Sequence, residues 1–497
     1  MTATLWIDVE DLFDYARNHQ RPSGIQRVAF EIFQALQTQY GGTGRVRFVR
    51  HDPPGGSFRA VEWPQIASLF SELTDSKPYS RTTKPVGISP PPRARQFLRK
   101  LVYRLPDPPR AQVIDVLVAQ EHVFRAWARL LGTLAHGLIR RTLRRLARHL
   151  HWGKVSAPPA GTLSTDLPDE GFAKRAKPGD TLLVLGAAWT FPNYAGRIGR
   201  QREQLGLRFA LLVYDIVPLR RPEWCDSNTT HLFRAFFDSV LPLCDQVFAV
   251  SRATAADVTA YARKQGIVLP GPVVPIPVGT GFGAAPPSTV MPRTNRLPPA
   301  GSYALFVSTI EARKNHQLLF RVWRRLLEEL PPEQVPTLVF AGRIGWLVGD
   351  LMQQIANTDY LNGKLIVVDK PSDTEISALY QGCLFTLYPS LYEGWGLPIT
   401  ESLAFGKPCL IANRTSLPEA GGSLVRQFDP ESLNDAYAEI HRAIMDPEGL
   451  ARWEEQVRRE FRPVPWTASA EALLATLGHG EECAIDVARA ALQSVAE

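Results

Sequence analysis

Short apolar segments alternate with amphipathic helical patterns over two long stretches of this chain, and this alternation restricts the folds open to it. The helical pattern after Asn315, for example, has one apolar face, formed by Leu318, Val322, Leu326 and Leu330. Alternation of strands and helices is typical of a parallel sheet with helices on both sides. We therefore predict an α/β protein with two doubly wound, Rossmann-like domains.

The strand-like runs give the expected order of the two sheets. They are 5–9, 46–50, 182–186, 209–214 and 246–250 in the first stretch, and 304–308, 337–341, 364–368, 384–388 and 408–412 in the second. Between them the pattern is lost over about 53–180, which we interpret as an insertion with its own helices. The predicted domains are 1–285 and 296–464, joined by a Pro- and Gly-rich linker, with further helices over 465–497.

Composition narrows the class of protein. A hydrophobic fraction of 45% in 497 residues is that of a globular chain. The five cysteines include no CxxC pair, which favours a reducing compartment without a zinc site or a disulfide framework. The first residues lack the basic head of a signal peptide, and no apolar run approaches the ~20 residues of a membrane span. We expect a cytoplasmic protein.

One segment supplies the excess positive charge. Residues 93–154 contain 14 Lys and Arg against 3 Asp and Glu, whereas the whole chain has a net charge of +7. Within it, 123–150 predicts a basic amphipathic helix, and two interpretations stay open: peripheral contact with an anionic membrane, or packing on the protein with a solvated arginine face. Nucleic-acid binding is disfavoured because interleaved aromatic residues are sparse.

A glycine-rich turn with two carboxylates follows the strand-like run 384–388. The turn is Glu393-Gly394-Trp395-Gly396, Pro398 stands in the first turn of the next helix, and Glu401 lies eight residues after Glu393. Parallel sheets hold ligands at the carboxyl ends of their strands, where helix amides face an anion. The pattern predicts a nucleotide-sugar site.

A second loop after a strand carries adjacent cations. Arg313 and Lys314 precede a helix, so side chains and helix dipole would favour the same diphosphate, although such a pair is more often solvated surface. Because no DxD-type acidic cluster adjoins these loops, we expect the two cations to replace a metal ion and no cofactor to be needed. Glu401 suits a ribose, and Glu393 suits sugar hydroxyls or positive charge on the ring.

The first domain offers weaker candidates. Gly24 precedes a helix expected at about 25–37 and is either the glycine turn of a nucleotide-binding fold or a residue that simply lets the helix start. Arg27, one turn into this helix, faces either a phosphate or solvent. Asp215 follows the run 209–214, where acidic groups meet ligands, but a turn or cap residue would look the same.

Several segments resemble the family 4 retaining glycosyltransferases of the GT-B fold, particularly bacterial surface-polysaccharide members. The most specific is LYPSLYEGWGLPITESLAFGKPCLIANRTSLPEAGG, in which Glu393 and Glu401 match the family's E-x7-E motif. VSTIEARKNHQ resembles its basic diphosphate motif at Arg313, Lys314 and Asn315. Further resemblances are LVFAGRIGW with Gly342, VYDIVPLRRPEW, FAVSRATAADV, SGIQRV with Gln26, and PWTASAEALLATL, which is similar to a helix that crosses back to the first domain.

The resemblance implies two domains facing a central cleft, with the nucleotide-diphosphate sugar held mainly by the second and the acceptor by the first. Arg313 and Lys314 would hold the diphosphate, Glu401 the ribose, and Glu393 with Gly394–Leu397 the sugar and phosphates. Transfer would retain configuration without a metal. Two departures stand out: Ser308 replaces a common arginine, and VLGAAWTF lacks a common histidine, which leaves Asp215 as the first-domain candidate.

We therefore expect a retaining hexosyltransferase of surface-polysaccharide synthesis, with GDP-mannose as first donor and a glycan or lipid-linked acceptor. It would be cytoplasmic or peripheral at the inner face of the membrane. The rivals are a non-catalytic GT-B-like binding protein at the membrane and an enzyme acting on free sugars. Glu393→Ala and Lys314→Ala are expected to abolish transfer and to leave thermal stability nearly unchanged.

Overall fold

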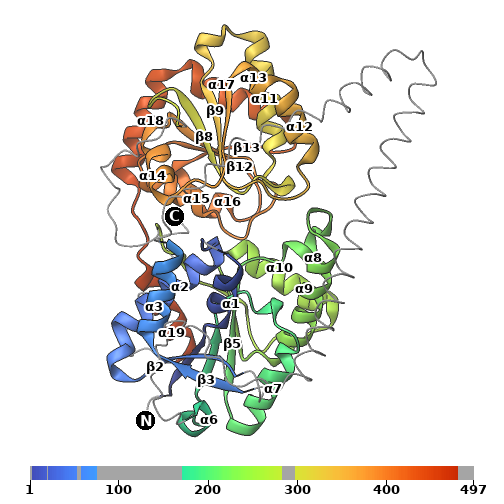
Figure 1. Ribbon diagram of the computed structural model, residues 1–497, viewed down its shortest axis with the longest axis vertical. Helices are drawn as coiled ribbons and strands as arrows, with labels where there is room; N and C mark the ends of the chain where they lie inside the picture. Colours follow the sequence, from blue (N-terminus) through green and yellow to red (C-terminus); the bar gives the residue numbers. More distant parts are fainter. Residues whose placement is uncertain (1–2, 20, 53–56, 75–170, 282–296, 479–497) are drawn as a thin grey trace, which may run out of the picture. The chain divides into compact units, whose positions relative to one another are not determined.

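The fold is built from two sheets in a computed structural model that describes residues 3–19, 21–52, 57–74, 171–281 and 297–478 (Figure 1). Both sheets fall within one compact unit, which comprises residues 1–78 and 168–497. Helices follow most strands and surround each sheet, so the predicted α/β class with two Rossmann-like domains is confirmed.

The first sheet has seven strands in the described residues, in the order β3-β2-β1-β4-β5-β6-β7. All neighbours are parallel except β2 and β3, which form a hairpin. The strands are β1 (Leu5–Asp8), β2 (Val46–His51), β3 (Phe58–Val61), β4 (Thr181–Val184), β5 (Arg208–Val213), β6 (Gln246–Ala249) and β7 (Val274–Pro275). The five runs predicted from the sequence correspond to β1, β2, β4, β5 and β6.

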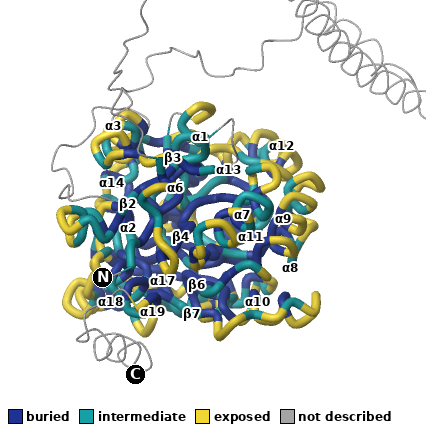
Figure 2. Tube along the Cα trace, turned by 90° about the horizontal axis from the view of Figure 1, so that it is seen from below, coloured by how far each residue is buried: buried dark blue, intermediate teal, exposed yellow. Residues whose placement is uncertain are grey.

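The helices of this sheet are α1 (Glu10–Asn18), α2 (Gly24–Tyr40), α3 (Trp63–Thr74), α6 (Phe172–Arg175), α7 (Tyr194–Leu205), α8 (Val217–Arg220), α9 (Ser227–Val240) and α10 (Arg252–Gln265), with short 3-10 turns at 41–43, 188–190, 222–224 and 241–243. Side chains alternate between its faces as a strand requires. Leu5 and Ile7 enter one apolar cluster with α2, whereas Trp6 enters another with α7 and α9. Both faces are therefore buried (Figure 2).

The second sheet is parallel throughout, in the order β10-β9-β8-β11-β12-β13. Its strands are β8 (Tyr303–Val307), β9 (Thr337–Ala341), β10 (Leu365–Val368), β11 (Phe385–Tyr388), β12 (Cys409–Ala412) and β13 (Arg426–Phe428). Its helices are α11 (His316–Glu329), α12 (Gly349–Asn357), α13 (Asp359–Asn362), α14 (Asp373–Gly382), α15 (Leu397–Ala404), α16 (Leu417–Gly421), α17 (Leu433–Met445) and α18 (Pro447–Glu460), with 3-10 turns at 312–314, 332–334 and 422–424.

Helix α19 (Trp466–Leu477) follows the second sheet but packs against the first. Its side chains Ala470, Leu473 and Leu474 are buried in the same apolar cluster as α2. The indole of Trp466 donates a hydrogen bond to the carbonyl of Gly281 at 2.9 Å, which fixes the start of the helix. The helix expected to cross back to the first domain is thus present.

Three strands escaped the sequence analysis. Residues 58–74, which we assigned to the insertion of 53–180, form β3 and α3 of the first sheet, so that assignment was wrong for them. A hairpin strand does not continue the strand–helix alternation on which the prediction rested. The short strands β7 and β13 gave no apolar run long enough to recognise. The basic segment 93–154 and the boundary at 285–296 lie outside the described residues, so their predictions stay untested.

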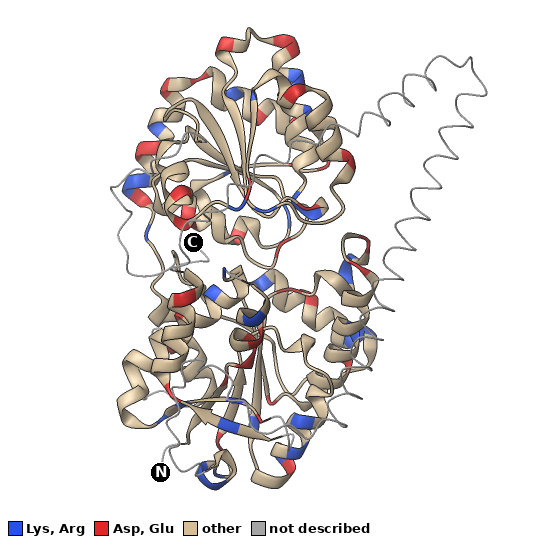
Figure 3. Ribbon diagram, viewed as in Figure 1, with Lys and Arg blue, Asp and Glu red and all other residues tan. Residues whose placement is uncertain are grey.

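Both signs of charge occur along the described part of the chain, with Lys and Arg as well as Asp and Glu on the helices of both sheets (Figure 3). Over the same residues, no helix combines the length and the apolar character needed to cross a membrane. The four described cysteines, Cys225, Cys244, Cys383 and Cys409, are free thiols.

Candidate functional site

Two loops of the second sheet meet because their strands are neighbours. Strand β8 leads through Glu311 into a 3-10 turn and then into α11, and β11 leads through Glu393 into α15. Since β8 and β11 are adjacent and parallel, their carboxyl ends lie at one edge of the sheet. The amide of Leu391 donates to the carbonyl of Arg313 at 3.0 Å, so the two backbones touch directly.

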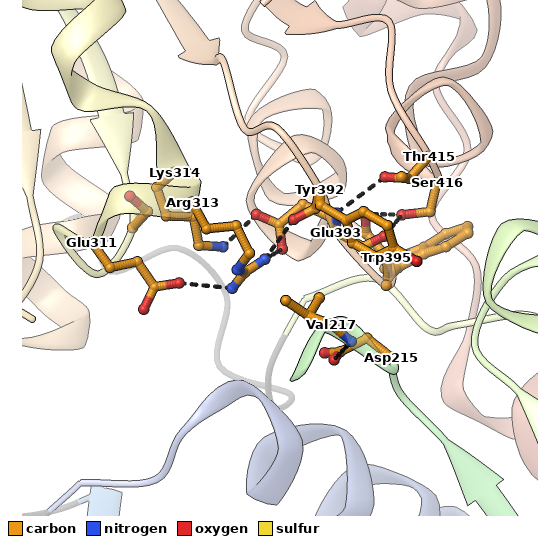
Figure 4. Close-up of polar contacts among 12 residues, drawn as sticks. Asp215, Val217, Glu311, Arg313, Lys314, Tyr392, Glu393, Trp395, Thr415 and Ser416 are labelled. Carbon is orange, nitrogen blue, oxygen red and sulfur yellow. Dashed lines mark hydrogen bonds and ion pairs between the residues drawn. The ribbon is translucent and has the colours of Figure 1, made fainter. Parts of the chain in front are cut away.

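The cations predicted for a diphosphate are joined by a carboxylate (Figure 4). Arg313 Nη1 donates to Glu393 Oε2 at 2.6 Å, and Lys314 Nζ donates to Glu393 Oε1 at 2.5 Å. Arg313 Nη2 donates to Glu311 Oε1 at 2.8 Å, and Arg313 Nη1 also reaches the carbonyl of Tyr392 at 2.6 Å. These four charged side chains, Glu311, Arg313, Lys314 and Glu393, form what we call the ion cluster.

The ion cluster is largely buried. The side chain of Glu393 is 10% exposed and those of its two cations are 12% and 18% exposed. Burial by itself would raise the pKa of Glu393, but the charges of Arg313 and Lys314, with their hydrogen bonds, outweigh it and lower the pKa to about 2. Burial by itself would lower the pKa of Arg313, but the charges of Glu393 and Glu311 raise this pKa above its usual value. Glu393 and Arg313 are therefore both charged at neutral pH.

The sequence did not reveal this pairing. Both oxygens of Glu393 are bound to cations, so its carboxylate positions Arg313 and Lys314, and its predicted contact with sugar hydroxyls stays a prediction. The sequence pattern predicted no role for Glu311, although its side chain is 3% exposed and holds the guanidinium of Arg313. The sequence feature that could have indicated this ion pair is the spacing of two positions between Glu311 and Arg313.

Acid unfolding should report the ion cluster. The pKa of Glu393 lies at about 2 instead of its ordinary 4.5, so its pairing stabilises the fold fully above pH ~4.5 and is lost as the pH falls towards 2. The loss amounts to about 3 kcal/mol in the free energy of unfolding. We expect Glu393→Gln to flatten the pH dependence between pH 4.5 and 2 by this amount, measured by urea unfolding. Parallel curves for both proteins would contradict the assignment.

The turn after Glu393 is held by neighbouring loops. The amide of Glu393 donates to Thr415 Oγ1 at 3.0 Å, and Ser416 Oγ donates to the carbonyls of Glu393 and Trp395 at 3.0 and 2.7 Å. Gly394 faces the first sheet: a Cβ there would overlap the carbonyl oxygen of Tyr214. Glycine is required because backbone approaches backbone.

Asp215 follows β5, next to this contact. Its Oδ1 accepts from the amide of Val217 at 3.0 Å, so it caps the turn that starts α8, which is the simpler of its two readings (Figure 4). Burial raises the pKa of Asp215, while the positive charge of Arg313 acts against that increase. Thr254 joins the two loops here, since its Oγ1 is 3.3 Å from the carbonyl oxygen of Tyr214 and 3.2 Å from that of Gly394.

Three predicted donor-binding residues support the backbone. Asn315 adopts a left-handed conformation at φ 60°, and its Nδ2 donates to the carbonyls of Pro389 and Pro430 at 3.3 and 3.0 Å. Ser308 Oγ lies 3.3 Å from His316 Nε2, and Gly342 packs against the carbonyl of Ser308, where a Cβ would overlap it. Their predicted contacts with the donor stay untested.

The second carboxylate of the pair stands apart from the ion cluster. Glu401 lies on α15, and its Oε2 accepts from Tyr380 Oη at 2.8 Å. Burial raises the pKa of Glu401, and the hydrogen bond from Tyr380 opposes this. Ahead of it, Gly396 starts α15 without a side-chain cap, and Leu397 packs against the apolar cluster of the first sheet. The uncapped helix start leaves amide dipoles for an anion.

The first-domain candidates are engaged in other contacts. Gln26 is buried and donates to Asp11 Oδ2 at 2.8 Å. The guanidinium of Arg27 donates to both carboxylate oxygens of Asp373, at 2.7 and 2.8 Å, so Arg27 meets the second sheet and the solvent-facing alternative is wrong. Gly24 is the first residue of α2. A Cβ added to Gly24 would lie 3.6 Å from Cδ1 of Leu397, so this glycine packs next to the start of α15.

Two buried polar atoms in the Glu393 loop lack a hydrogen-bond partner among the described residues. They are Ser390 Oγ and the indole nitrogen of Trp395. Buried polar groups are normally paired, and exceptions often mark ligand contacts. Over all residues that the structure describes, no group of three or more His, Cys, Asp or Glu side chains is arranged to hold a metal ion.

The structure thus combines two doubly wound sheets with charged loops at the carboxyl ends of two neighbouring strands of the second sheet. Residues 289–460 match the family model described as "Glycosyl transferases group 1". This segment is therefore similar to the group 1 glycosyltransferases, in agreement with the family resemblance.

Two relatives are named as mannosyltransferases. The chain is 28% identical over 301 residues to "Serotype-specific mannosyltransferase WbdA" of Escherichia coli, covering 58% of this chain and 36% of the relative. It is 32% identical over 144 residues to "O-antigen chain mannosyltransferase B" of Escherichia coli, covering 29% and 37%. The alignments thus span little more than a third of either relative. A crystal structure of TarM is similar with a TM-score of 0.45 and 11% identity, covering 61% of this chain and 55% of that one.

Proposed function

We propose that this chain is a retaining hexosyltransferase that moves a hexose or deoxyhexose from a nucleotide-diphosphate sugar to a glycan or lipid-linked glycan. The observation that supports it most is the ion cluster at the carboxyl ends of β8 and β11, inside the matched segment. The names of the relatives favour mannose as the sugar and surface polysaccharide as the product. GDP-mannose is therefore the first donor to test.

The ion cluster suits the leaving group. Cleavage of the sugar–phosphate bond leaves additional negative charge on the diphosphate, and preorganised cations stabilise that charge without reorganisation. Arg313 and Lys314 would hold it, while Glu393 and Glu311 keep both cations oriented when no diphosphate is bound. The uncapped start of α15 adds the helix dipole on the same side. We propose that no metal ion or other cofactor is needed.

The retaining step follows from the same groups. A front-face route has the acceptor hydroxyl attack on the side of the departing diphosphate, and the leaving phosphate oxygen accepts the acceptor's proton. In this proposal Glu401 binds the ribose, and the loop 394–397 binds the sugar and phosphates. The role of Asp215 would be to face the acceptor, because its Cβ lies next to Gly394, the residue that follows Glu393.

The test is a panel of NDP-sugars, each offered with neutral oligosaccharide acceptors and with lipid-linked ones, in the presence of EDTA. We expect hydrolysis or transfer with one or two donors, GDP-mannose first, and an α-anomeric product. Inertness towards all donors with an intact fold would refute the proposal. Nucleotide binding without turnover would instead identify the membrane-associated binding protein that was the alternative.

A further inference from the structure

An apolar patch lies on the loop between β9 and α12. Ile344, Trp346 and Leu347 are 47%, 46% and 61% exposed, and they account for three of the seven exposed large apolar side chains in the described residues. Leu347 has φ 56°, a left-handed conformation that is unfavourable for leucine. Single exposed apolar residues are ordinary, but a cluster presented by a strained turn indicates a binding surface.

The loop is firmly attached beside the ion cluster. Ile344 forms a parallel bridge with Ile310, and the amide of Gly345 donates to the carbonyl of Ile310 at 2.8 Å. A Cβ on Gly345 would lie 3.4 Å from Cβ of Glu311, the residue that holds Arg313. Trp346 therefore directly follows a residue that packs against Glu311, a member of the ion cluster.

A second tryptophan from the first sheet joins the patch. The indole N–H of Trp346 donates to the carbonyl of Trp224 at 2.8 Å, which orients the ring while leaving its faces unused by that bond. The guanidinium of Arg221 lies 4.1 Å from the centre of the Trp224 ring. Burial raises the pKa of the next residue, Cys225, to about 11, and the charges of Asp215 and Arg313 also act on it. The indole of Trp346 and the backbone of Trp224 therefore meet at the patch.

The charges around the patch are balanced. Arg221 pairs with Glu223 at 2.6 Å, and Arg220 pairs with Asp257 at 3.3 Å. An anionic lipid or a phosphate would have to compete with these carboxylates, so a neutral ligand is favoured over an anionic one. A neutral pyranose has an apolar face of C–H groups and a rim of hydroxyls, which matches indole rings bordered by hydrogen-bonding groups.

We propose that Trp346 and Trp224, with Ile344 and Leu347 beside them, bind the neutral glycan acceptor of this chain. This inference rests on the proposed function, because it names the acceptor class and a subsite leading to the ion cluster. The sugar nearest the ion cluster would receive the transferred hexose, and sugars further along the acceptor would stack on the indole rings. Longer acceptors should therefore bind more tightly than monosaccharides.

The experiment measures binding without turnover. The full-length chain and Trp346→Ala are titrated by calorimetry with neutral oligosaccharides of one to six residues, α-linked mannans first, and separately with the donor found in the panel or with free GDP. We expect at least a tenfold rise in Kd for the hexasaccharide in Trp346→Ala and no change in nucleotide Kd. Trp346→Phe should retain most binding, since it keeps an aromatic face, and Tyr360→Ala, which removes another exposed aromatic ring, should match the wild type.

The other outcomes overturn the proposal in distinguishable ways. An unchanged hexasaccharide Kd in Trp346→Ala, or failure of the wild type to bind any of the oligosaccharides, removes the subsite. A rise in nucleotide Kd alone assigns the patch to a nucleobase, and loss of flotation with phosphatidylglycerol vesicles alone assigns it to a membrane. Absence of donor turnover refutes the proposed function but not this binding result, because the titration needs no donor.

Discussion

Replacing Gly394 by alanine is expected to abolish sugar transfer and to destabilise the chain. The added methyl group would overlap the carbonyl oxygen of Tyr214 and lie 3.0 Å from Cβ of Asp215. The obstructing group is backbone at the end of β5, which cannot swing aside as a long side chain can. The Glu393 loop or the strand end must move, at a cost of about 1–3 kcal/mol for overpacking.

That movement reaches the ion cluster because Gly394 directly follows Glu393. A displacement of about 1 Å at a positioning group can lower the rate by about 10²-fold. The hydrogen bond between Thr254 and the carbonyl of Gly394 would be lost as well. Initial rates with the best donor and thermal unfolding should both report the change.

Gly271→Ala is the matched control. It makes the same chemical change at a glycine whose hypothetical Cβ meets no atom within 4 Å. We expect its stability to stay within about 0.5 kcal/mol of the wild type and its rate to be unchanged. Wild-type turnover by Gly394→Ala would show that the two loops do not approach each other as described.

The second large effect concerns Glu393 and Lys314. Lys314→Met is expected to lower transfer by about 10²–10³-fold, because one preorganised positive charge at the leaving group is lost. Glu393→Gln should lower stability by about 3–5 kcal/mol, since it leaves a buried lysine without a carboxylate. The expectation from the sequence that stability would be nearly unchanged is therefore revised: the side chains are mostly buried and paired.

The double variant gives the sharpest result. Lys314→Met should lower the melting temperature of the wild type, where it breaks the pair, but raise that of Glu393→Gln, where it removes an uncompensated charge. The pair Arg324 and Glu328, with side chains 56% and 64% exposed, is the control. There the coupling should be about 0.5 kcal/mol or less, without a change of sign. Additive effects at 314 and 393 would contradict the ion cluster.

Most of the sheet framework could be predicted from the sequence. Ten strands were expected within one or two residues of their observed positions, and the capping box that Ser372 and Glu375 form at α14 is likewise set by residues three positions apart. These features depend on periodicity and on bonds between residues a few positions apart. Strand β3 was missed because it pairs in a hairpin, and the short β13 because it has three residues.

The site residues were found individually, but several of their partners were not. Arg27 meets Asp373 across 346 positions, and Asn315 donates to carbonyls 74 and 115 positions away. Nothing in the local pattern around Arg27 distinguishes such an ion pair from a solvated charge. The placement of Gly394 against Tyr214 likewise joins loops from different sheets.

The sequence alone therefore determined the α/β class, the position of most strands and the two loops that supply Arg313, Lys314 and Glu393. Only the tertiary structure decided that Arg313 and Lys314 both pair with Glu393, that Glu311 completes the ion cluster, and that Glu401 stands apart with Tyr380. The physical reason is the separation along the chain between the residues that interact. Periodicity and capping are local, whereas these contacts depend on β8 lying beside β11 in a sheet whose strand order no short segment specifies.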